Sequence, residues 1–306
     1  MSLLPKDADI LSPCDDRVFR LLLTAPEAEP TLKLVAEEIV QQPVKKVEVR
    51  GNELPVHDTE GKQERFDVHC KINNDMQSNI EMQSQPMEEV KGSSHSNLRA
   101  RSVFNLCKLY VSQESIGMQY DSLSRTYQVM FCGFTVFRER KDFINTFSMR
   151  HDLDNGLLHN AIQSIFVELT KLREILKKPI EHMTNMERFA IFLKYADNPR
   201  HRETVNDVIR SREALVVASE VLQSISRDEN ERAIFRSRRK YQMDLASDLA
   251  TMEQRGINKG IALGRTEGER AKAFSIAQGL LSTNLTIEEI VRITGLTRTE
   301  IENIRG

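Results

Sequence analysis

Two short segments with alternating apolar and polar residues, separated by a turn, place the strongest constraint on how this chain can fold. In residues 66–72 every second side chain is apolar, and the same alternation recurs in residues 80–83. A period of two is the pattern of a β-strand with one buried face. The intervening Asn73-Asn74-Asp75 has the composition of a turn. The sequence therefore predicts two neighbouring strands that can pair.

Each of these strands carries an acidic residue on its polar side. Asp67 lies in the first strand and Glu81 in the second, both out of phase with the apolar positions. If the strands pair, the two carboxylates project from the same side of the sheet. Mg²⁺ prefers oxygen ligands and typically takes one or two protein carboxylates together with water. Asp67 and Glu81 are therefore candidate metal ligands for phosphodiester hydrolysis.

Two further groups next to Glu81 are candidates for the same site. The Met82 carbonyl is a candidate third ligand, and the Gln83 amide points to the side of Glu81 and could orient water or contact a phosphate. The residues alone also leave a simpler alternative open. Acids on exposed strand faces are usually just solvated.

The first half of the chain alternates helix and strand signals. The almost wholly apolar segment 127–137 is typical of a strand buried on both faces of a sheet. A shorter strand is expected at 44–49. Amphipathic periodicity predicts helices over residues 16–23, 31–41 and 98–113. This alternation indicates an α/β region.

The second half is expected to be helical throughout. Apolar residues between 157 and 169 follow a wide helical stripe, so we expect no strand after about residue 150. Further helices are predicted near residues 184–196, 202–225 and 228–250.

The C-terminal tail has its own pattern. Glycines at positions 256, 260, 264 and 268 recur every four residues, a spacing that places them along one ridge of a helix and permits close helix approach. Two capping boxes, starting at Thr286 and Thr297 on either side of Gly295, predict a pair of short helices. The second helix carries as many acids as bases, so helix packing or self-association is favoured over DNA reading.

Composition narrows the function classes. The net charge of -2 excludes a global basic field for nucleic acid, so any DNA contact must be local. The four cysteines show no C-x-x-C spacing, so a zinc knuckle or a redox pair is not expected. Cysteines that lie within apolar patterns, as some of these do, suit a reducing compartment. No apolar run is long enough to span a membrane and no signal core opens the chain, so we expect a cytoplasmic protein without a membrane partner.

Taken in order, several motifs resemble those of the PD-(D/E)XK nuclease family transposases, also called recombination-promoting nucleases. The order and spacing of the motifs carry the resemblance, which is most specific between about residues 14 and 172. The matching motifs are Asp16-Arg17-Val18-Phe19-Arg20, Lys62 with Arg65-Phe66-Asp67-Val68, Ile80-Glu81-Met82-Gln83, Arg101 with Phe104 and Tyr110, Gly117 with Tyr120, and residues 165–171.

The resemblance implies roles for particular residues. Asp67 and Glu81 would hold the metal, with Asp16 as a further catalytic acid nearby. Gln83 stands where the broader superfamily has Lys, a form common within this family, and it lacks the charge that would stabilise an oxyanion. Arg101 and Lys171 would contact DNA phosphates.

The resemblance also implies a fold and a function. The fold would be an α/β restriction-endonuclease-like core, a mixed sheet flanked by helices, with an all-helical C-terminal region. We expect a nuclease-like core at 1–172, a helical extension at 173–250 and a tail at 251–306. The function would be Mg²⁺-dependent DNA cleavage linked to recombination or transposition, with Mn²⁺ able to substitute.

Two alternatives belong to other functional classes. Gln83 and the near-neutral charge favour a catalytically inactive nuclease fold that binds DNA or a protein partner. The tail could instead make the chain an assembly protein that forms homo-oligomers.

Overall fold

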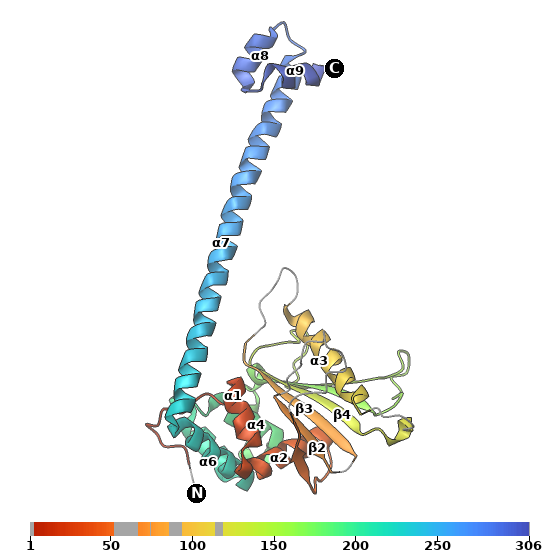
Figure 1. Ribbon diagram of the computed structural model, residues 1–306, viewed down its shortest axis with the longest axis vertical. Helices are drawn as coiled ribbons and strands as arrows, with labels where there is room; N and C mark the ends of the chain where they lie inside the picture. The colour runs from red at the N-terminus through yellow and green to blue at the C-terminus, as the bar shows by residue number, and fades with distance from the viewer. Residues whose placement is uncertain (1–2, 52–66, 74, 86–93, 114–118, 306) are drawn as a thin grey trace. The chain divides into compact units, whose positions relative to one another are not determined.

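A mixed sheet of six strands lies at the centre of the N-terminal part of the chain (Figure 1). The computed structural model describes residues 3–51, 67–73, 75–85, 94–113 and 119–305. The strand order is β1-β2-β3-β4-β6-β5. The strands are β1 (Val47–Val49), β2 (Val68–Ile72), β3 (Met76–Gln83), β4 (Arg125–Cys132), β5 (Ile144–Ser148) and β6 (Ile162–Glu168). β3, β4 and β6 are mutually parallel, whereas β1, β2 and β5 pair with their neighbours antiparallel.

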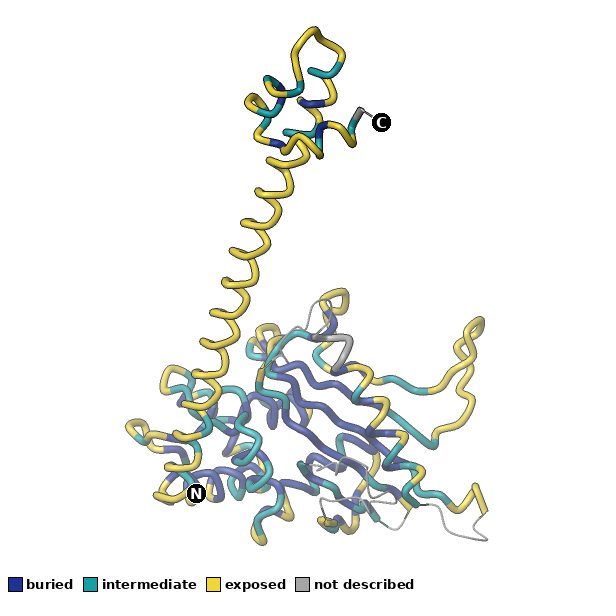
Figure 2. Tube along the Cα trace, turned by 45° about the horizontal axis from the view of Figure 1, so that its top comes forward, coloured by how far each residue is buried: buried dark blue, intermediate teal, exposed yellow. Residues whose placement is uncertain are grey.

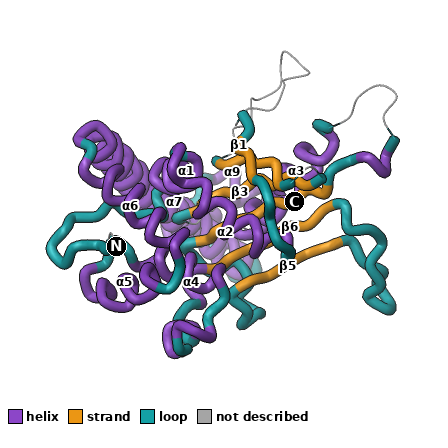
Figure 3. Tube along the Cα trace, turned by 90° about the horizontal axis from the view of Figure 1, so that it is seen from below, coloured by secondary structure: helices purple, strands orange, loops and turns teal. Residues whose placement is uncertain are grey.

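One face of the sheet is covered by a layer of helices and forms the main hydrophobic core (Figure 3). Phe131 of β4 is fully buried there, with ring centroids 5.5 Å from Phe19 and 5.8 Å from Phe189. These aromatic contacts join the sheet to helices from both halves of the chain. The helices of this layer are α1 (Asp16–Thr24), α2 (Glu29–Val40), α4 (Asn185–Tyr195), α5 (Arg202–Arg210) and α6 (Glu213–Arg227).

The opposite face of the sheet packs against a single helix of the described residues, α3 (Ser94–Val111). Its apolar contacts are few and centre on Leu98, Met130 and Phe166. Much of this buried face is polar, including a hydrogen bond of 2.7 Å between the hydroxyls of Ser102 and Ser164. A polar interior of this kind needs a hydrogen-bond partner for each group.

The expected α/β fold is confirmed, and so are its first elements. The two alternating segments form β2 and β3, which pair antiparallel. The helices expected at 16–23, 31–41 and 98–113 are α1, α2 and α3, and the apolar segment at 127–137 contains β4. Part of the evidence for the family resemblance lies outside the described residues, namely Lys62, Arg65, Phe66 and Gly117.

The expectation of a helix over 157–169 is wrong. Residues 162–168 form β6, which pairs with β4 on one side and β5 on the other. A strand between two others inside a covered sheet is apolar on both faces, so its short apolar run matches a helical stripe equally well. Leu157 and Leu158, which the helical stripe included, are exposed.

The C-terminal helices also differ in detail from the expectation. The helix expected at 202–225 is divided into α5 and α6, and the helix expected at 228–250 is α7 (Glu229–Leu280), which continues through all four regularly spaced glycines. The chain separates into two compact units, residues 1–235 and 236–306, with the boundary inside α7. The nuclease-like core and its helical extension share one hydrophobic core in the first unit. The division into 1–172, 173–250 and 251–306 stays a prediction.

The second unit holds its own small hydrophobic core. Helices α8 (Ile287–Thr294) and α9 (Arg298–Arg305) pack on the end of α7 around Ala277, Ile290 and Ile301. Both predicted capping boxes are confirmed, and Gly295 ends α8 with φ of 72°, in the left-handed region that favours glycine. By contrast, every residue of α7 from 239 to 272 is exposed (Figure 2).

Gly133 allows β3 and β4 to end side by side. Its amide donates to the Gln83 carbonyl at 2.8 Å, and an added Cβ would overlap the backbone carbonyl of Ser84. We therefore expect Gly133→Ala to lower the free energy of unfolding by about 1–3 kcal/mol, because neither backbone segment can move away cheaply. Urea unfolding of the two proteins measures the difference. Gly51→Ala is the matched control, since a Cβ there meets open space; equal stability of the two variants would contradict this account.

Candidate functional site

The pairing of β2 and β3 brings Asp67 and Glu81 opposite each other. Val68 lies across from Ile80, so the preceding residue on β2 and the following residue on β3 face the same side of the sheet. That side is the one covered by α3, away from the main hydrophobic core. The Met82 amide donates to Asp67 Oδ2 at 3.1 Å and fixes the carboxylate directly before the start of β2.

Glu81 is a buried carboxylate held by three side chains, with only 6% of its surface exposed. Asn79 and Asn105 donate to its Oε1 at 2.7 and 3.0 Å. The Arg101 guanidinium lies 3.4 Å from its Oε2. The alternative of a simply solvated acid is therefore wrong for Glu81, because a buried charge must be paired and hydrogen-bonded to be tolerated.

The pKa of Asp67 is raised to about 7, mainly because burial disfavours its charged form. The hydrogen bond from the Met82 amide and the charge of Arg101 lower the pKa, whereas the charges of Glu81 and Asp16 raise it. Asp16 is the first residue of α1, so this helix brings a third acid within electrostatic reach of the pair. Burial, with a smaller contribution from the two neighbouring acids, thus brings the pKa of Asp67 close to neutral pH.

Met82 and Gln83 complete the end of β3. The Gln83 side-chain amide donates to the Met82 carbonyl at 3.0 Å. A backbone carbonyl has a second lone pair, so this bond leaves the oxygen able to accept another partner. Gln83 lies two residues after Glu81 on the same strand, so its uncharged side chain is on the same side of the sheet as the acid pair.

The sequence interpretation missed the two amides that hold Glu81. Asn79 lies two residues before Glu81 on the same strand face, and its amide also donates to Gln128 of β4 at 2.9 Å. Asn105 lies four residues after Arg101, one turn along α3, so both reach the same carboxylate. Both spacings are visible in the sequence, but only the packing of α3 on β3 shows what they contact.

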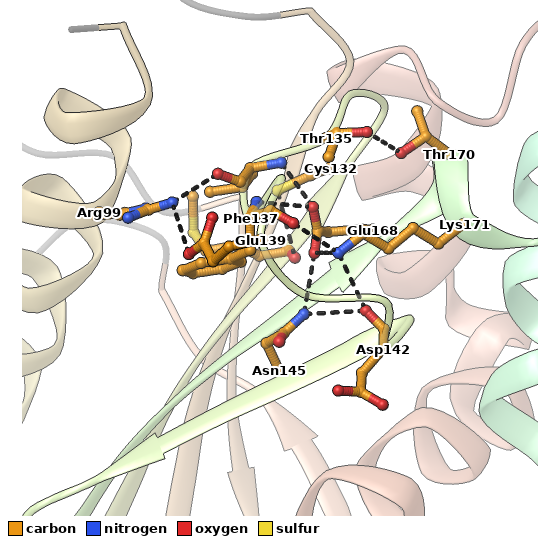
Figure 4. A network of polar contacts seen from close by, with 12 residues as sticks. Arg99, Cys132, Thr135, Phe137, Glu139, Asp142, Asn145, Glu168, Thr170 and Lys171 are labelled. Atoms are coloured by element: carbon orange, nitrogen blue, oxygen red, sulfur yellow. Dashed lines mark hydrogen bonds and ion pairs between the residues drawn. The ribbon is translucent and has the colours of Figure 1, made fainter.

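Lys171 lies in a different network, at the end of β6 (Figure 4). Its ammonium contacts Glu168 Oε2 at 2.5 Å and the carbonyls of Phe137 and Asp142 at 3.0 and 3.2 Å. These bonds occupy all three donors of the amine. The structure therefore brings Asp16, Asp67, Glu81, Gln83 and Arg101 together but leaves Lys171 bound elsewhere, and its phosphate contact stays a prediction.

The donor set fits a small divalent cation with water completing its shell. Among the described residues, no group of three or more His, Cys, Asp or Glu side chains is arranged to hold a metal. Two carboxylates, with a backbone carbonyl beside them, match the few protein ligands that Mg²⁺ normally takes. The raised pKa of Asp67 adds to the fit, because a bound cation would replace the retained proton.

The fold and the placement of the acids define a class of protein. A mixed six-stranded sheet flanked by helices, with acids on two adjacent strands, has the architecture of a restriction-endonuclease-like α/β protein. A family model described as PD-(D/E)XK nuclease family transposase matches residues 13–252, and the chain belongs to this family. Comparisons with curated proteins and with solved structures find no match. Within the described part of the chain, no helix has the length and apolar character needed to cross a membrane.

The raised pKa of Asp67 predicts a pH-dependent stability. Because the folded state binds the proton more tightly than the unfolded state, where the pKa is near 3.8, the free energy of unfolding should fall as pH rises from about 4 through 7. The loss from this group is on the order of 2 kcal/mol. Asp67→Asn should remove this part of the pH dependence in urea unfolding.

Asp75→Asn provides the control, because Asp75 is exposed in the turn of the same hairpin. It should keep the pH dependence of the wild type. An Asp67→Asn profile parallel to that of the wild type would contradict the assignment of the raised pKa to Asp67.

Proposed function

We propose that this protein is a Mg²⁺-dependent DNA endonuclease, linked to recombination or transposition, that hydrolyses phosphodiester bonds at Asp67 and Glu81. The observation that carries the proposal is the position of Asp67, directly before β2, next to Glu81 on β3 in a chain of the PD-(D/E)XK nuclease family. Nucleases of this superfamily generally use divalent metals, which supports Mg²⁺ as the cofactor and Mn²⁺ as a substitute.

Asp67 and Glu81 are the proposed metal ligands, with the Met82 carbonyl as a third. A bound divalent cation would lower the pKa of water and stabilise the charge that develops on the phosphate. Asn79 and Asn105 hold the Glu81 carboxylate in one orientation. Since hydrogen bonds from surrounding residues fix the orientation of ligands, both amides act as positioning residues.

The remaining polar groups have proposed roles at the same place. Asp16 adds negative charge next to Asp67, which favours cation binding. Gln83 would orient the attacking water or contact the phosphate through its amide. Arg101 lies against Glu81 and is the proposed phosphate contact on α3. Lys171 could contact a phosphate only after its bonds to Glu168 and to the carbonyls of Phe137 and Asp142 are broken.

A catalytically inactive nuclease fold that binds DNA or a protein partner is the second candidate. The observation that favours it is Gln83, whose uncharged amide stands where the superfamily has Lys. This candidate predicts DNA retention that survives Glu81→Ala and no cleavage with any divalent ion.

Plasmid cleavage tests the metal-dependent reaction. We expect nicking or linearisation with Mg²⁺ or Mn²⁺ and none with chelator, and Asp67→Asn and Glu81→Gln should each lower the rate by at least about 100-fold because each removes a negatively charged ligand. Asp75→Asn makes the same substitution at the exposed turn of the hairpin and should cleave at the wild-type rate.

The outcomes separate the candidates. Cleavage that survives chelator and Asp67→Asn would rule out the proposed metal mechanism. DNA binding without cleavage by the wild type, under all divalent ions, would favour the inactive fold instead.

We also propose that the tail joins copies of this chain into a homo-oligomer. Leu245, Leu249, Met252 and Leu263 lie along one side of α7 and are exposed. The same side continues to Ala277, where α8 and α9 cover it within one chain. Since long helices in water depend on packing of an apolar side for most of their stability, a second copy of α7 is the proposed cover for the uncovered part.

A location in the cytoplasm stays a prediction of the sequence.

Charge on this apolar side should disrupt the oligomer. We expect Leu249→Glu with Met252→Glu to convert the full-length protein to monomers in sedimentation velocity, because two like charges would be buried between the helices. Ser247→Glu with Gln254→Glu adds the same charge on the opposite side of α7 and should leave the assembly intact. A monomeric wild type would refute the proposal.

A further inference from the structure

A loop with several basic residues starts at the end of the sheet that carries the acid pair. Gln83 of β3, Cys132 of β4 and Glu168 of β6 are neighbours in register, and these three strands are parallel. Their C-terminal ends therefore lie side by side. The chain leaves β4 at Gly133 and forms a loop over residues 134–142 before it enters β5.

A fully buried carboxylate, that of Glu168, anchors the loop to the sheet through hydrogen bonds (Figure 4). Its Oε1 accepts from the backbone amides of Val136 and Phe137 at 2.6 and 3.1 Å. Its Oε2 accepts from Asn145 at 2.9 Å and from Lys171 at 2.5 Å. Asn145 and Lys171 also donate to backbone carbonyls of the loop. Glu168 and Lys171 therefore fix the shape of the loop.

Apolar packing adds to this anchoring. Phe137 is 4% exposed, and its ring packs against Phe147 and Phe166 with centroids 5.1 Å away in both cases. On its other side, the Arg99 guanidinium of α3 lies 4.3 Å from the ring centroid and donates to the Val136 carbonyl at 2.7 Å. The loop is thus joined to both α3 and the sheet.

The solvent side of the loop is basic. Arg138, Arg140 and Lys141 are exposed, and Arg140 lies over the Phe147 ring at 5.6 Å from its centroid. The loop also holds two exposed acids, Glu139, which lies 3.7 Å from Arg99, and Asp142, so its three cations exceed its acids by one. In a chain whose net charge is only -2, this concentration of cations is local and not part of a general basic surface.

The loop anchor and the acid pair are electrostatic neighbours. Burial raises the pKa of the Cys132 thiol, and the charges of Glu168 and Glu81 raise it further. The charge of Arg101 lowers it. Cys132 therefore lies between the two networks on one face of the sheet. Any duplex presented to Asp67 and Glu81 at this end of the sheet would pass close to the loop.

We propose that Arg138, Arg140 and Lys141 form a DNA-backbone contact surface that binds phosphates flanking the one presented to the acid pair. The proposal rests on the nuclease function proposed above and adds where the duplex lies. Arginine and lysine neutralise phosphates and release counterions, independently of base sequence. Because the loop is held in one conformation before binding, little ordering entropy is lost when it meets the backbone.

The test is the salt dependence of duplex binding by the full-length chain, with Ca²⁺ in place of Mg²⁺. Fluorescence anisotropy with a random-sequence duplex gives log Kobs against log salt for the wild type and for Arg138→Gln with Lys141→Gln. We expect the double variant to bind more weakly and its slope to be shallower by about 2, since each lost phosphate contact removes roughly 0.9.

The matched control is Lys45→Gln with Lys46→Gln. These two exposed lysines precede β1 at the opposite end of the sheet, because Val47 lies level with Ile72 and Met76. The control should keep the wild-type slope. If both double variants weaken duplex binding equally, the weakening comes from the change in net charge and the proposal is overturned.

Failure of this inference differs from failure of the nuclease function. A wild type that binds and cleaves DNA, together with a loop variant of unchanged slope, overturns the contact surface alone. A wild type that neither binds duplex nor cleaves it overturns both.

Discussion

The burial of the Glu81 charge is the constraint on which the polar half of this structure depends. A carboxylate removed from water costs several kcal/mol unless donors replace its hydration. Here the donors come from its own strand through Asn79 and from α3 through Arg101 and Asn105. The contacts of Arg101 and Asn105 with this acid therefore join α3 to the sheet in addition to its apolar packing.

The two faces of the sheet follow different physical rules as a result. On the face of Phe131, close packing of aromatic and aliphatic side chains stabilises the fold without directional bonds. On the face beneath α3, the buried carboxylates depend on hydrogen bonds, which extend from Asp67, directly before β2, to Glu168 on β6. Directional bonds fix positions more narrowly than apolar contacts do, which suits the face that carries the proposed site.

The sequence predicted those features that local periodicity controls and missed those that tertiary pairing controls. The alternation around Asp67 and Glu81 was sufficient to place both acids on one side of the sheet. β6 was missed, because burial of both faces removes the alternation that marks a strand. Likewise, nothing local distinguishes Asn105 or Glu168 from an ordinary helix or strand residue; their partners lie 24 and 32 residues away along the chain.

The uncharged Gln83 is easier to understand once the charges around Glu81 are considered together. A lysine at that position would place a second cation beside a carboxylate that Arg101 already contacts. Two cations at the acid pair would lower the pKa of Asp67 and compete with a divalent ion for the same oxygens. With Gln83, the charges of Glu81 and Asp16 are opposed only by Arg101, and these two acids add to the effect of burial in raising the pKa of Asp67. In the proposed metal site, the uncharged Gln83 therefore leaves Arg101 of α3 as the cation that faces Glu81.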